Sequence, residues 1–410
     1  MPSHTVIRDW ILQVGYYKIM TIKKAKDWIG IIDLSIQVGS KKCLLILGVR
    51  AATLLNKKPL TFEDVSVLHI ELLEKTSGSI IYEAIKKSEA KVGQYIQFCQ
   101  DQGSDIGAGA RLYIQNVKEK EGRKIILVND ISHKIANLLA IEVEKLGWSE
   151  FASQVSKMKN RLQFTQWAIL CPPNQRSKSR YMNLDEIINW SKKIILHIKE
   201  TEEKCSTLQK QFFLENQYLK NLLEKFGWIK SKESMIYEIS ELLFIGKIVR
   251  QKIRNQGIHL KTSSELELEL QNLSIRTSAN QFVNNILDFI DKQTKDLEDT
   301  RIALGCTEII ESVFGKLKQL MDEDTKDGFT PFVLSIAACV GKLNLEIVQK
   351  ALSSSSKKQV NNWIKENFPE SICSQRRKLF RFFSKSKIKQ LKDWWVQDLA
   401  TINIDKVMNL

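Results

Sequence analysis

Acidic residues at three separate points of the chain are candidate metal ligands. Asp33 lies within the apolar run IIDLSI, where a carboxylate is costly to bury unless a cation lies beside it. Asp101 follows the apolar run QYIQFCQ and stands two residues before Gly103, so a strand would fix the carboxylate while a loop exposes its oxygen atoms. Two plainer roles remain open. Asp33 would face outward on an edge strand, and Asp101 would serve a turn or cap a helix, a role that suits Asp105 even better.

A third acid is needed, because two Mg²⁺ ions about 3.5–4 Å apart require several oxygen ligands. Asp130 ends another apolar run, and its neighbour His133 favours a supporting hydrogen-bond role. Glu308 and Glu311 are three residues apart and therefore share one face of a predicted helix. Glu308 suits the first turn of that helix, near its positive end.

Glu311 is the third acid that we expect. It lies one turn deeper, between Ile310 and Val313, where the helix is expected to pack on the sheet. An acid at the margin of a packed face needs a compensating cation, which a metal ion would supply. Lys316 and Lys318 follow at a spacing that reaches a phosphate near this carboxylate. The alternative for these charges is an ordinary solvated helix face.

The elements that must position these acids follow from the period of the apolar residues. Seven runs are predicted after a short N-terminal helix over 3–20: strands at 28–39, 41–50 and 64–75, a helix at 77–90, a strand at 94–99, a helix at 106–119 and a strand at 124–130. The first three strands are expected to be antiparallel. This order is that of a ribonuclease-H-like α/β core, in which a three-stranded meander is extended by helix–strand units.

After Ser132 the pattern changes to helical periodicity nearly free of Pro and Gly, interrupted by the loop CPPNQ. Heptad-like spacing over 187–226 predicts a helical hairpin. A single apolar helix is expected over 333–348. We therefore expect an α/β core interrupted by a large all-α insertion, with helical extensions at both ends. The expected divisions are 1–27 (N-terminal segment), 28–140 (first part of the core), 141–299 (helical insertion), 300–350 (second part of the core) and 351–410 (basic aromatic tail).

The charge balance indicates a polyanionic partner, because 62 Lys and Arg exceed 47 Asp and Glu to give +15. Basic and aromatic residues alternate over 375–395, where cations would neutralise phosphates and aromatic rings would stack on bases. The DNA contacts predicted there are Arg376, Arg377, Lys378 and Arg381. The alternative is an amphipathic packing helix. The seven cysteines include no CxxC pair and no apolar run is long enough to span a membrane, so we expect a cytoplasmic protein without a membrane partner.

Taken together, these residues resemble a family. Asp33, Asp101 in QDQGSD and a Glu in TEIIESVFGKLK resemble the Asp-Asp-Glu triad of bacterial insertion-sequence transposases with a ribonuclease-H-like core. Glu311 followed by Lys318 matches the Glu-x₆-Lys part of a signature in one such group, whose preceding Tyr and Arg are absent here. The motif DISH at 130–133 resembles the Cys/Asp-x-x-His element of hAT-type transposases, which also carry a helical insertion before the catalytic Glu. The resemblance covers roughly residues 3–345.

The resemblance implies metal-dependent hydrolysis and strand transfer at the ends of a mobile element, with DNA ends and target DNA as partners. Asp33, Asp101 and Glu311 would bind two Mg²⁺ ions, for which Mn²⁺ can substitute, and a homodimer is left open. Only about 30 residues precede Asp33, where such transposases carry a helical DNA-binding domain, so the chain is a shortened copy or another part recognises the ends. The alternatives are another ribonuclease-H-like nuclease and a non-catalytic DNA-binding protein.

Four tryptophans fall within the expected insertion, and by default they belong to its core. They are Trp148, Trp167, Trp190 and Trp228. In related enzymes an aromatic residue of the insertion stacks on a flipped base.

Because the chain is so basic, we expect its affinity for DNA to fall steeply between low and physiological salt. Deleting residues 375–410 should weaken binding and flatten the salt dependence, since each lost phosphate contact removes about one unit of the log–log slope. Fluorescence anisotropy with a labelled duplex over a salt series measures both quantities. An unchanged slope would leave the tail with a packing role.

Overall fold

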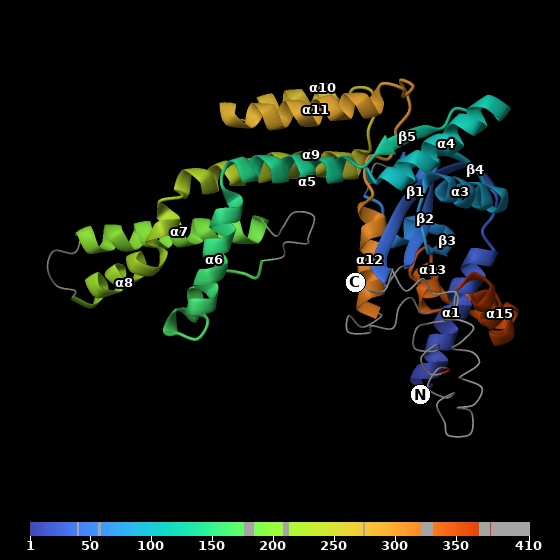
Figure 1. Ribbon diagram of the computed structural model, residues 1–410, viewed down its shortest axis with the longest axis horizontal. Helices are drawn as coiled ribbons and strands as arrows, with labels where there is room; N and C mark the ends of the chain where they lie inside the picture. Colours follow the sequence, from blue (N-terminus) through green and yellow to red (C-terminus); the bar gives the residue numbers. More distant parts are fainter. Residues whose placement is uncertain are drawn as a thin grey trace, which may run out of the picture.

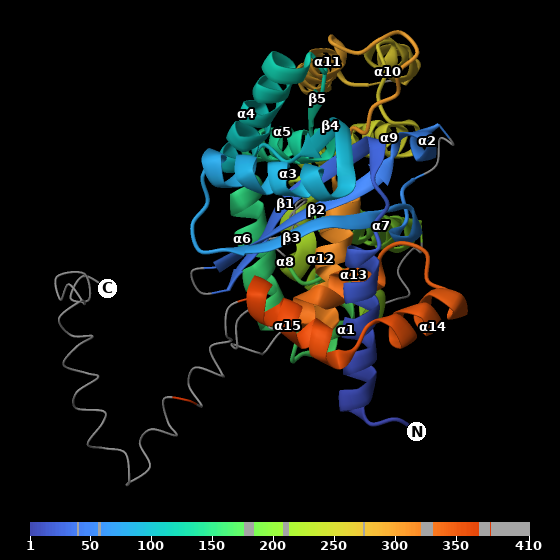
Figure 2. The ribbon, with the colours of Figure 1, turned by 90° about the vertical axis from the view of Figure 1, so that its right-hand side faces the viewer.

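The structure is a computed structural model that describes residues 1–38, 41–55, 59–175, 184–207, 213–273, 275–320, 331–368 and 378. It contains a five-stranded sheet in the order β3-β2-β1-β4-β5 (Figures 1 and 2). β1 pairs antiparallel with β2, and β2 antiparallel with β3, while β4 lies parallel to β1 and β5 parallel to β4. The strands are β1 (Ala25–Val38), β2 (Lys41–Arg50), β3 (Ser66–Leu73), β4 (Gly93–Gln100) and β5 (Ile126–Asn129). The predicted order of strands and helices and the mixed α/β class are confirmed.

The central strands are apolar on both sides because both faces of the sheet are covered. Ile31 and Leu45 belong to the core on one face, and Ile32 and Leu44 to the core on the other. Strands buried on both faces need near-continuous apolar sequence, which explains the runs in β1 and β2. The sheet therefore separates two packed layers of helices.

Two helices cover the face that bears Ile32: α3 (Gly78–Val92) and α4 (Ser104–Glu121). Ser77 caps α3 by accepting a hydrogen bond from the amide of Ile80 at 3.4 Å. The two helices approach closely at Gly109, where a Cβ atom would lie 2.5 Å from the Cβ of Ile81. A glycine is required there by space, since any side chain would separate the helices.

The face that bears Ile31 is covered by helices from both ends of the chain. They are α1 (His4–Met20), α12 (Glu308–Leu320), α13 (Ser335–Cys339) and α15 (Lys357–Asn367), with α14 (Leu345–Ser354) packed on α1. Ser3 caps α1 as its sequence indicates. α12 confirms the helix predicted to carry Glu308 and Glu311, and it packs against this face.

The single apolar helix predicted over 333–348 is wrong. α13 ends at Cys339, and the chain turns at Gly341, which has a φ of +72°, before α14 begins at Leu345. The ammonium group of Lys18 on α1 donates hydrogen bonds to the carbonyls of Val340 (2.6 Å) and Gly341 (3.3 Å). These carbonyls are thus satisfied outside a helix, so the turn costs no buried unpaired groups.

α2 (Ala51–Leu54) follows β2 in the core, and the helices from α5 to α11 form an arm that projects from one corner of the core (Figure 1). Within the described part of 141–299 every regular element is helical, and one isolated bridge joins Ile258 to Ala303. The predicted hairpin corresponds to α7 and α8, which pack together. The expected division at 140/141 falls inside α5. The arm consists of α5 (Ile131–Lys145), α6 (Trp148–Leu162), α7 (Leu184–Thr207), α8 (Phe213–Lys230), α9 (Glu233–Gln256), α10 (Thr262–Gln271) and α11 (Asn280–Thr294).

The chain returns from the arm to the sheet along residues 301–307. The buried amide of Gln97 on β4 holds this segment, because its Nε2 donates to the carbonyl of Leu304 at 2.8 Å and its Oε1 accepts from the amide of Leu304 at 3.1 Å. The amide of Ile131 at the start of the arm donates to the carbonyl of Gly305 at 3.0 Å. The two ends of the arm therefore meet. None of the helices that the structure describes is long and apolar enough to cross a membrane.

Replacing Gln97 by Ala should destabilise the protein by about 2–4 kcal/mol, because both polar groups of the Leu304 backbone would be left buried without partners. Urea unfolding followed by circular dichroism measures the change. Gln115→Ala is the matched control, since Gln115 is exposed and bonds only to Glu119 on its own helix among the contacts described. Equal effects of the two substitutions would contradict the clamping role of Gln97.

Candidate functional site

Asp33 and Asp101 stand at the same place on two neighbouring parallel strands. Ile32, the residue before Asp33, pairs with Gln100, the residue before Asp101. β4 ends at Gln100, so both aspartates follow the last pair of the parallel ladder, where adjacent strands are about 4.8 Å apart. Asp33 pairs with Leu45 on its other side and thus shares the face of the sheet that α12 covers.

Each aspartate also makes a local hydrogen bond. Oδ1 of Asp33 accepts from the amide of Leu34 at 2.7 Å, and Oδ1 of Asp101 accepts from the amide of Gly103 at 3.0 Å. Asp101 therefore has the turn role considered above, and it also lies beside Asp33. The edge-strand role considered for Asp33 is wrong, because β1 is the central strand of the sheet. Both residues are half-buried.

Asp130 joins three elements of the core. It is fully buried at the end of β5, where its Oδ1 accepts from the amide of His133 at 3.2 Å and so caps α5. Its Oδ2 accepts from the hydroxyl of Thr307 at 2.5 Å, and its amide donates to the carbonyl of Gln100 at 2.7 Å. Asp130 thus fixes the start of α5 and of α12 relative to the end of β4. His133 contributes its backbone amide to this arrangement.

Glu308, the first residue of α12, connects the core to the arm. Its Oε1 accepts from the hydroxyl of Ser132 on α5 at 3.1 Å, and its Oε2 lies 3.7 Å from Nε of Arg254 on α9. Sequence reasoning missed Arg254, which carries no motif and stands among several other basic residues near the end of a long helix. The sequence marks Arg254 only as a basic residue in the last turn of α9, a position where a cation is favourable in any helix.

Glu311 lies one turn further along α12 and is half-buried. Its neighbours Ile310 and Val313 are buried against the face of the sheet that bears Ile31. Lys316 is exposed on the same helix. The side chain of Lys318, like Arg376, Arg377 and Arg381, lies outside the described residues, while Lys378 is exposed, and their DNA contacts stay predictions.

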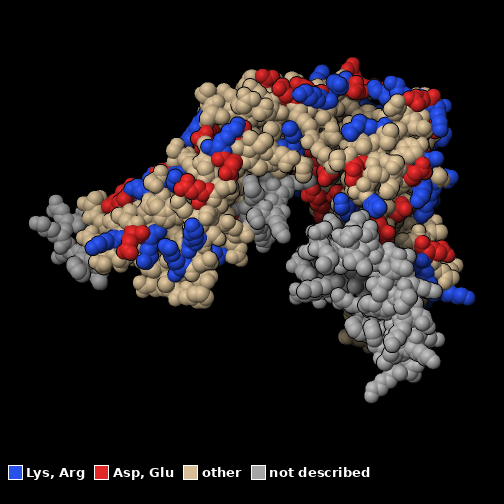
Figure 3. Space-filling model, in the orientation of Figure 1, with Lys and Arg blue, Asp and Glu red and all other residues tan. Residues whose placement is uncertain are grey.

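The carboxyl ends of β4 and β5 form a dry, negatively charged environment. Burial, followed by the nearby charges of Asp130 and Glu308, raises the pKa of Cys306 to about 12. The pKa of Cys99 on β4 is raised by burial, and further by Asp130 and Cys306. Acidic side chains also gather on the surface where the arm meets the core (Figure 3). Arg254, which acts to lower the pKa of Cys306, already supplies one cation beside Glu308.

The donors at this end of the sheet are carboxylate oxygens, which suit Mg²⁺ or Mn²⁺ rather than softer metals. Asp33 and Asp101 are aligned by the strand register and fit two ligands of such an ion. Within the described residues, no group of three or more His, Cys, Asp and Glu side chains is gathered closely enough to hold a metal ion. In this structure, therefore, neither Glu308 nor Glu311 of α12 forms a metal-binding group together with Asp33 and Asp101.

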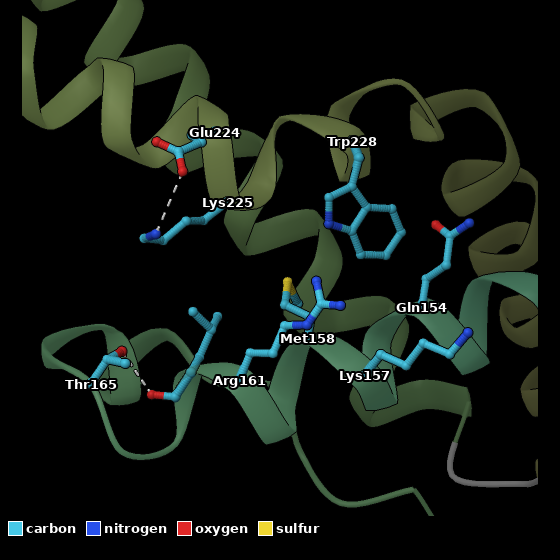
Figure 4. Close-up of a pocket in the computed structure, with 9 residues that line it drawn as sticks. Gln154, Lys157, Met158, Arg161, Thr165, Glu224, Lys225 and Trp228 are labelled. Atoms are coloured by element: carbon cyan, nitrogen blue, oxygen red, sulfur yellow. Dashed lines mark hydrogen bonds and ion pairs between the residues drawn. The ribbon is translucent and has the colours of Figure 1, made fainter.

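A separate hollow of about 440 Å³ lies on the arm, between α6 and α8. Trp228 lies on one side of it, facing Lys157 and Arg161 across the opening, with Lys225 and Glu224 at its end (Figure 4). Of the other tryptophans of the arm, Trp148 and Trp167 are buried, and Trp190 is partly buried and donates to the carbonyl of Leu170. Trp228 is also partly buried and packs against this core, with its ring 5.5 Å from that of Phe151, so the core role expected by default fits all four tryptophans.

No family model and no curated protein sequence matches the chain. Among solved structures, it is similar to the Drosophila P element transposase strand transfer complex, with a TM-score of 0.33 and 13% sequence identity. The match covers 85% of this chain and 87% of that chain.

In the folded protein, Cys306 should resist alkylation by iodoacetamide at pH 8. The thiolate is the reactive form, and with a pKa of about 12 only about one thiol in ten thousand is ionised at that pH. Cys171 and Cys205, which are partly exposed, serve as internal controls and should be labelled first. Mass spectrometry of the digested protein identifies the labelled positions. Labelling of Cys306 as fast as Cys205 would show that 301–307 does not dock as described.

Proposed function

We propose that the protein is a metal-dependent DNA transposase with a ribonuclease-H-like core. The observation that carries the proposal is the alignment of Asp33 and Asp101 after the last pair of the β1–β4 ladder, on the face covered by the helix that bears Glu311. The strand order β3-β2-β1-β4-β5, with an antiparallel meander extended by two parallel strands, supports this kind of core. The helical arm between β5 and α12 supports the likeness to hAT-type insertions.

Asp33, Asp101 and Glu311 are the proposed ligands of two Mg²⁺ ions. Bound at this site, the ions would supply an activated hydroxyl nucleophile and stabilise the leaving oxygen of a phosphodiester. The chain's own contribution is to hold two carboxylates side by side despite their mutual repulsion, which the strand register does. Because Asp130 and Thr307 hold the start of α12, the side chain of Glu311 would have to reorient toward the two aspartates when cation and DNA bind.

Glu311 is preferred over the other two acids because of its place on α12. It is half-buried between Ile310 and Val313, at the margin of the face that packs on the sheet. Asp130 instead is fully buried and bonds to Thr307 and to the first turn of α5. Glu308 bonds to Ser132 and lies beside Arg254. Removing Asp130 or Glu308 from these contacts would leave buried or charged groups unpaired.

The proposed reaction is attack on a phosphodiester at an element end, first by water and then by a DNA 3′-hydroxyl. Attack by a hydroxyl that the site orients explains why the three acids suffice without a protein nucleophile. Lys316 and Lys318 would contact the backbone beside the scissile phosphate. The hollow on the arm would receive DNA, since it combines an aromatic face at Trp228 with the cations Lys157 and Arg161.

Substituting Asp33 or Asp101 by Asn, or Glu311 by Gln, should lower metal-dependent nicking of a supercoiled plasmid by at least about a thousandfold, because each removes a charged ligand. DNA binding should remain. Asp105→Asn is the control, since this nearby acid accepts a hydrogen bond from Thr76 that Asn can keep. Glu308→Gln should retain most of the activity. Gel electrophoresis of plasmid incubated with Mg²⁺ or Mn²⁺ measures nicking.

The alternatives give different results in the same assay. A non-catalytic DNA-binding protein would bind DNA without nicking it under any metal condition. A nuclease would nick DNA without joining element ends to a target. If Glu311→Gln still nicks DNA and Glu308→Gln does not, the roles of the two acids on α12 exchange.

A further inference from the structure

A second hollow of about 460 Å³ lies at the opposite end of β1 from Asp33. It is formed by the end of α1, the first residues of β1 and β3, the end of β2 and the turn after α13 (Figure 2). Four cations line it, namely Lys18, Lys23, Arg50 and Lys342, and none of the described lining residues is acidic. We call it the basal hollow.

The backbone of the turn that carries Lys342 is held by hydrogen bonds from Lys18. Lys18 is half-buried, and burial lowers its pKa. Its ammonium group donates to the carbonyls of Ala338, Val340 and Gly341 at 3.5, 2.6 and 3.3 Å. Because all its donors are used on the turn, Lys18 acts as a support, and the backbone that presents Lys342 is fixed before any ligand binds.

Arg50 is fixed in a similar way on the other side. Its Nε donates to Asp27 at 2.7 Å, and its guanidinium lies 5.3 Å from the centre of the Trp28 ring. Trp28 is itself held, because its indole nitrogen donates to the carbonyl of Val92 at 2.9 Å. Asp27 balances the charge of Arg50, so the uncompensated charge comes from elsewhere in the hollow.

Lys23 and Lys342 supply that uncompensated charge. Both side chains are exposed, and neither has an ion-pair or hydrogen-bond partner in the part of the chain that the structure describes. These two ammonium groups and the Arg50 guanidinium line one hollow together with the buried side chains of Ile19 and Val67. An anion bound in the hollow would be attracted by all three cations.

We propose that the basal hollow binds phosphate, and that its source is the backbone of a DNA strand running past the end of the sheet away from the carboxylates. Phosphate is the expected ligand because the hollow is concave and partly apolar, and because cations but no described acids line it. DNA as the source follows from the net charge of +15. This choice of source rests on the proposed function. A free phosphate compound has the same chemistry and is separated by the experiment.

The test uses the full chain with Lys23→Glu and Lys342→Glu together. The matched control carries Lys118→Glu and Lys120→Glu, which reverse the same number of charges at exposed positions of α4. Binding of a labelled duplex is measured by anisotropy over a salt series without metal. We expect the hollow variant to bind at least about tenfold more weakly, with the log–log salt slope reduced by about two, while the control keeps most of its affinity and slope. Thermal unfolding checks that both variants fold.

A second experiment distinguishes DNA from a free phosphate compound as the source of the phosphate. Wild type and both variants are titrated with inorganic pyrophosphate, and the shift in melting temperature is recorded. Stabilisation by pyrophosphate that only the hollow variant loses, with DNA binding unchanged, would assign the site to a free phosphate compound and overturn DNA as the source. If the hollow variant and the control variant have the same DNA affinity and the same response to pyrophosphate, the proposed site is wrong. Neither experiment involves DNA cleavage. The outcome for the basal hollow is therefore independent of whether substitutions of Asp33, Asp101 and Glu311 abolish nicking.

Discussion

Two negative charges held side by side at the end of a parallel strand pair are the constraint on which the rest of the structure depends. The register that pairs Ile32 with Gln100 leaves Asp33 and Asp101 as the next residues on adjacent strands. Like charges at that spacing destabilise the fold unless a cation or hydrogen-bond donors compensate them. Backbone amides of Leu34 and Gly103 each donate a hydrogen bond to one of these carboxylates. A cation bound between the carboxylates, as proposed above, would compensate their charge further.

The surroundings of this pair are organised by buried hydrogen bonds rather than by apolar packing alone. Asp130 links the end of β4 to the starts of α5 and α12, and Gln97 holds the backbone that leads into α12. Buried polar groups of this kind specify a single arrangement, because any displacement leaves a donor or acceptor unpaired. Packing of Ile310 and Val313 then sets the depth of α12 against the sheet.

The sequence predicts the strands, the helices and the acids at the strand ends because these depend on local patterns. Apolar, β-branched runs define β1 to β3, and an acid directly after such a run, as at Asp101 and Asp130, falls at the end of a strand. The break at Gly341 was not predictable, since apolar helical periodicity continues on both sides and the carbonyls are satisfied by Lys18, which is more than 300 residues away. The contact of Arg254 with Glu308 likewise depends on where the arm returns, which no local pattern encodes.

The meeting of Ile131 with Gly305 has a consequence for how the chain folds. Asp130 and Thr307 are 177 residues apart in sequence, so closing that loop in an unfolded chain would be slow and entropically costly. Helices form from local contacts, and once α5 to α11 have folded, the chain ends 3.0 Å from where the excursion began. During synthesis the sheet is complete long before α12 emerges. We therefore expect the folded arm to bring the two ends of the excursion together, so that the helix with Glu308 and Glu311 docks after the arm has folded.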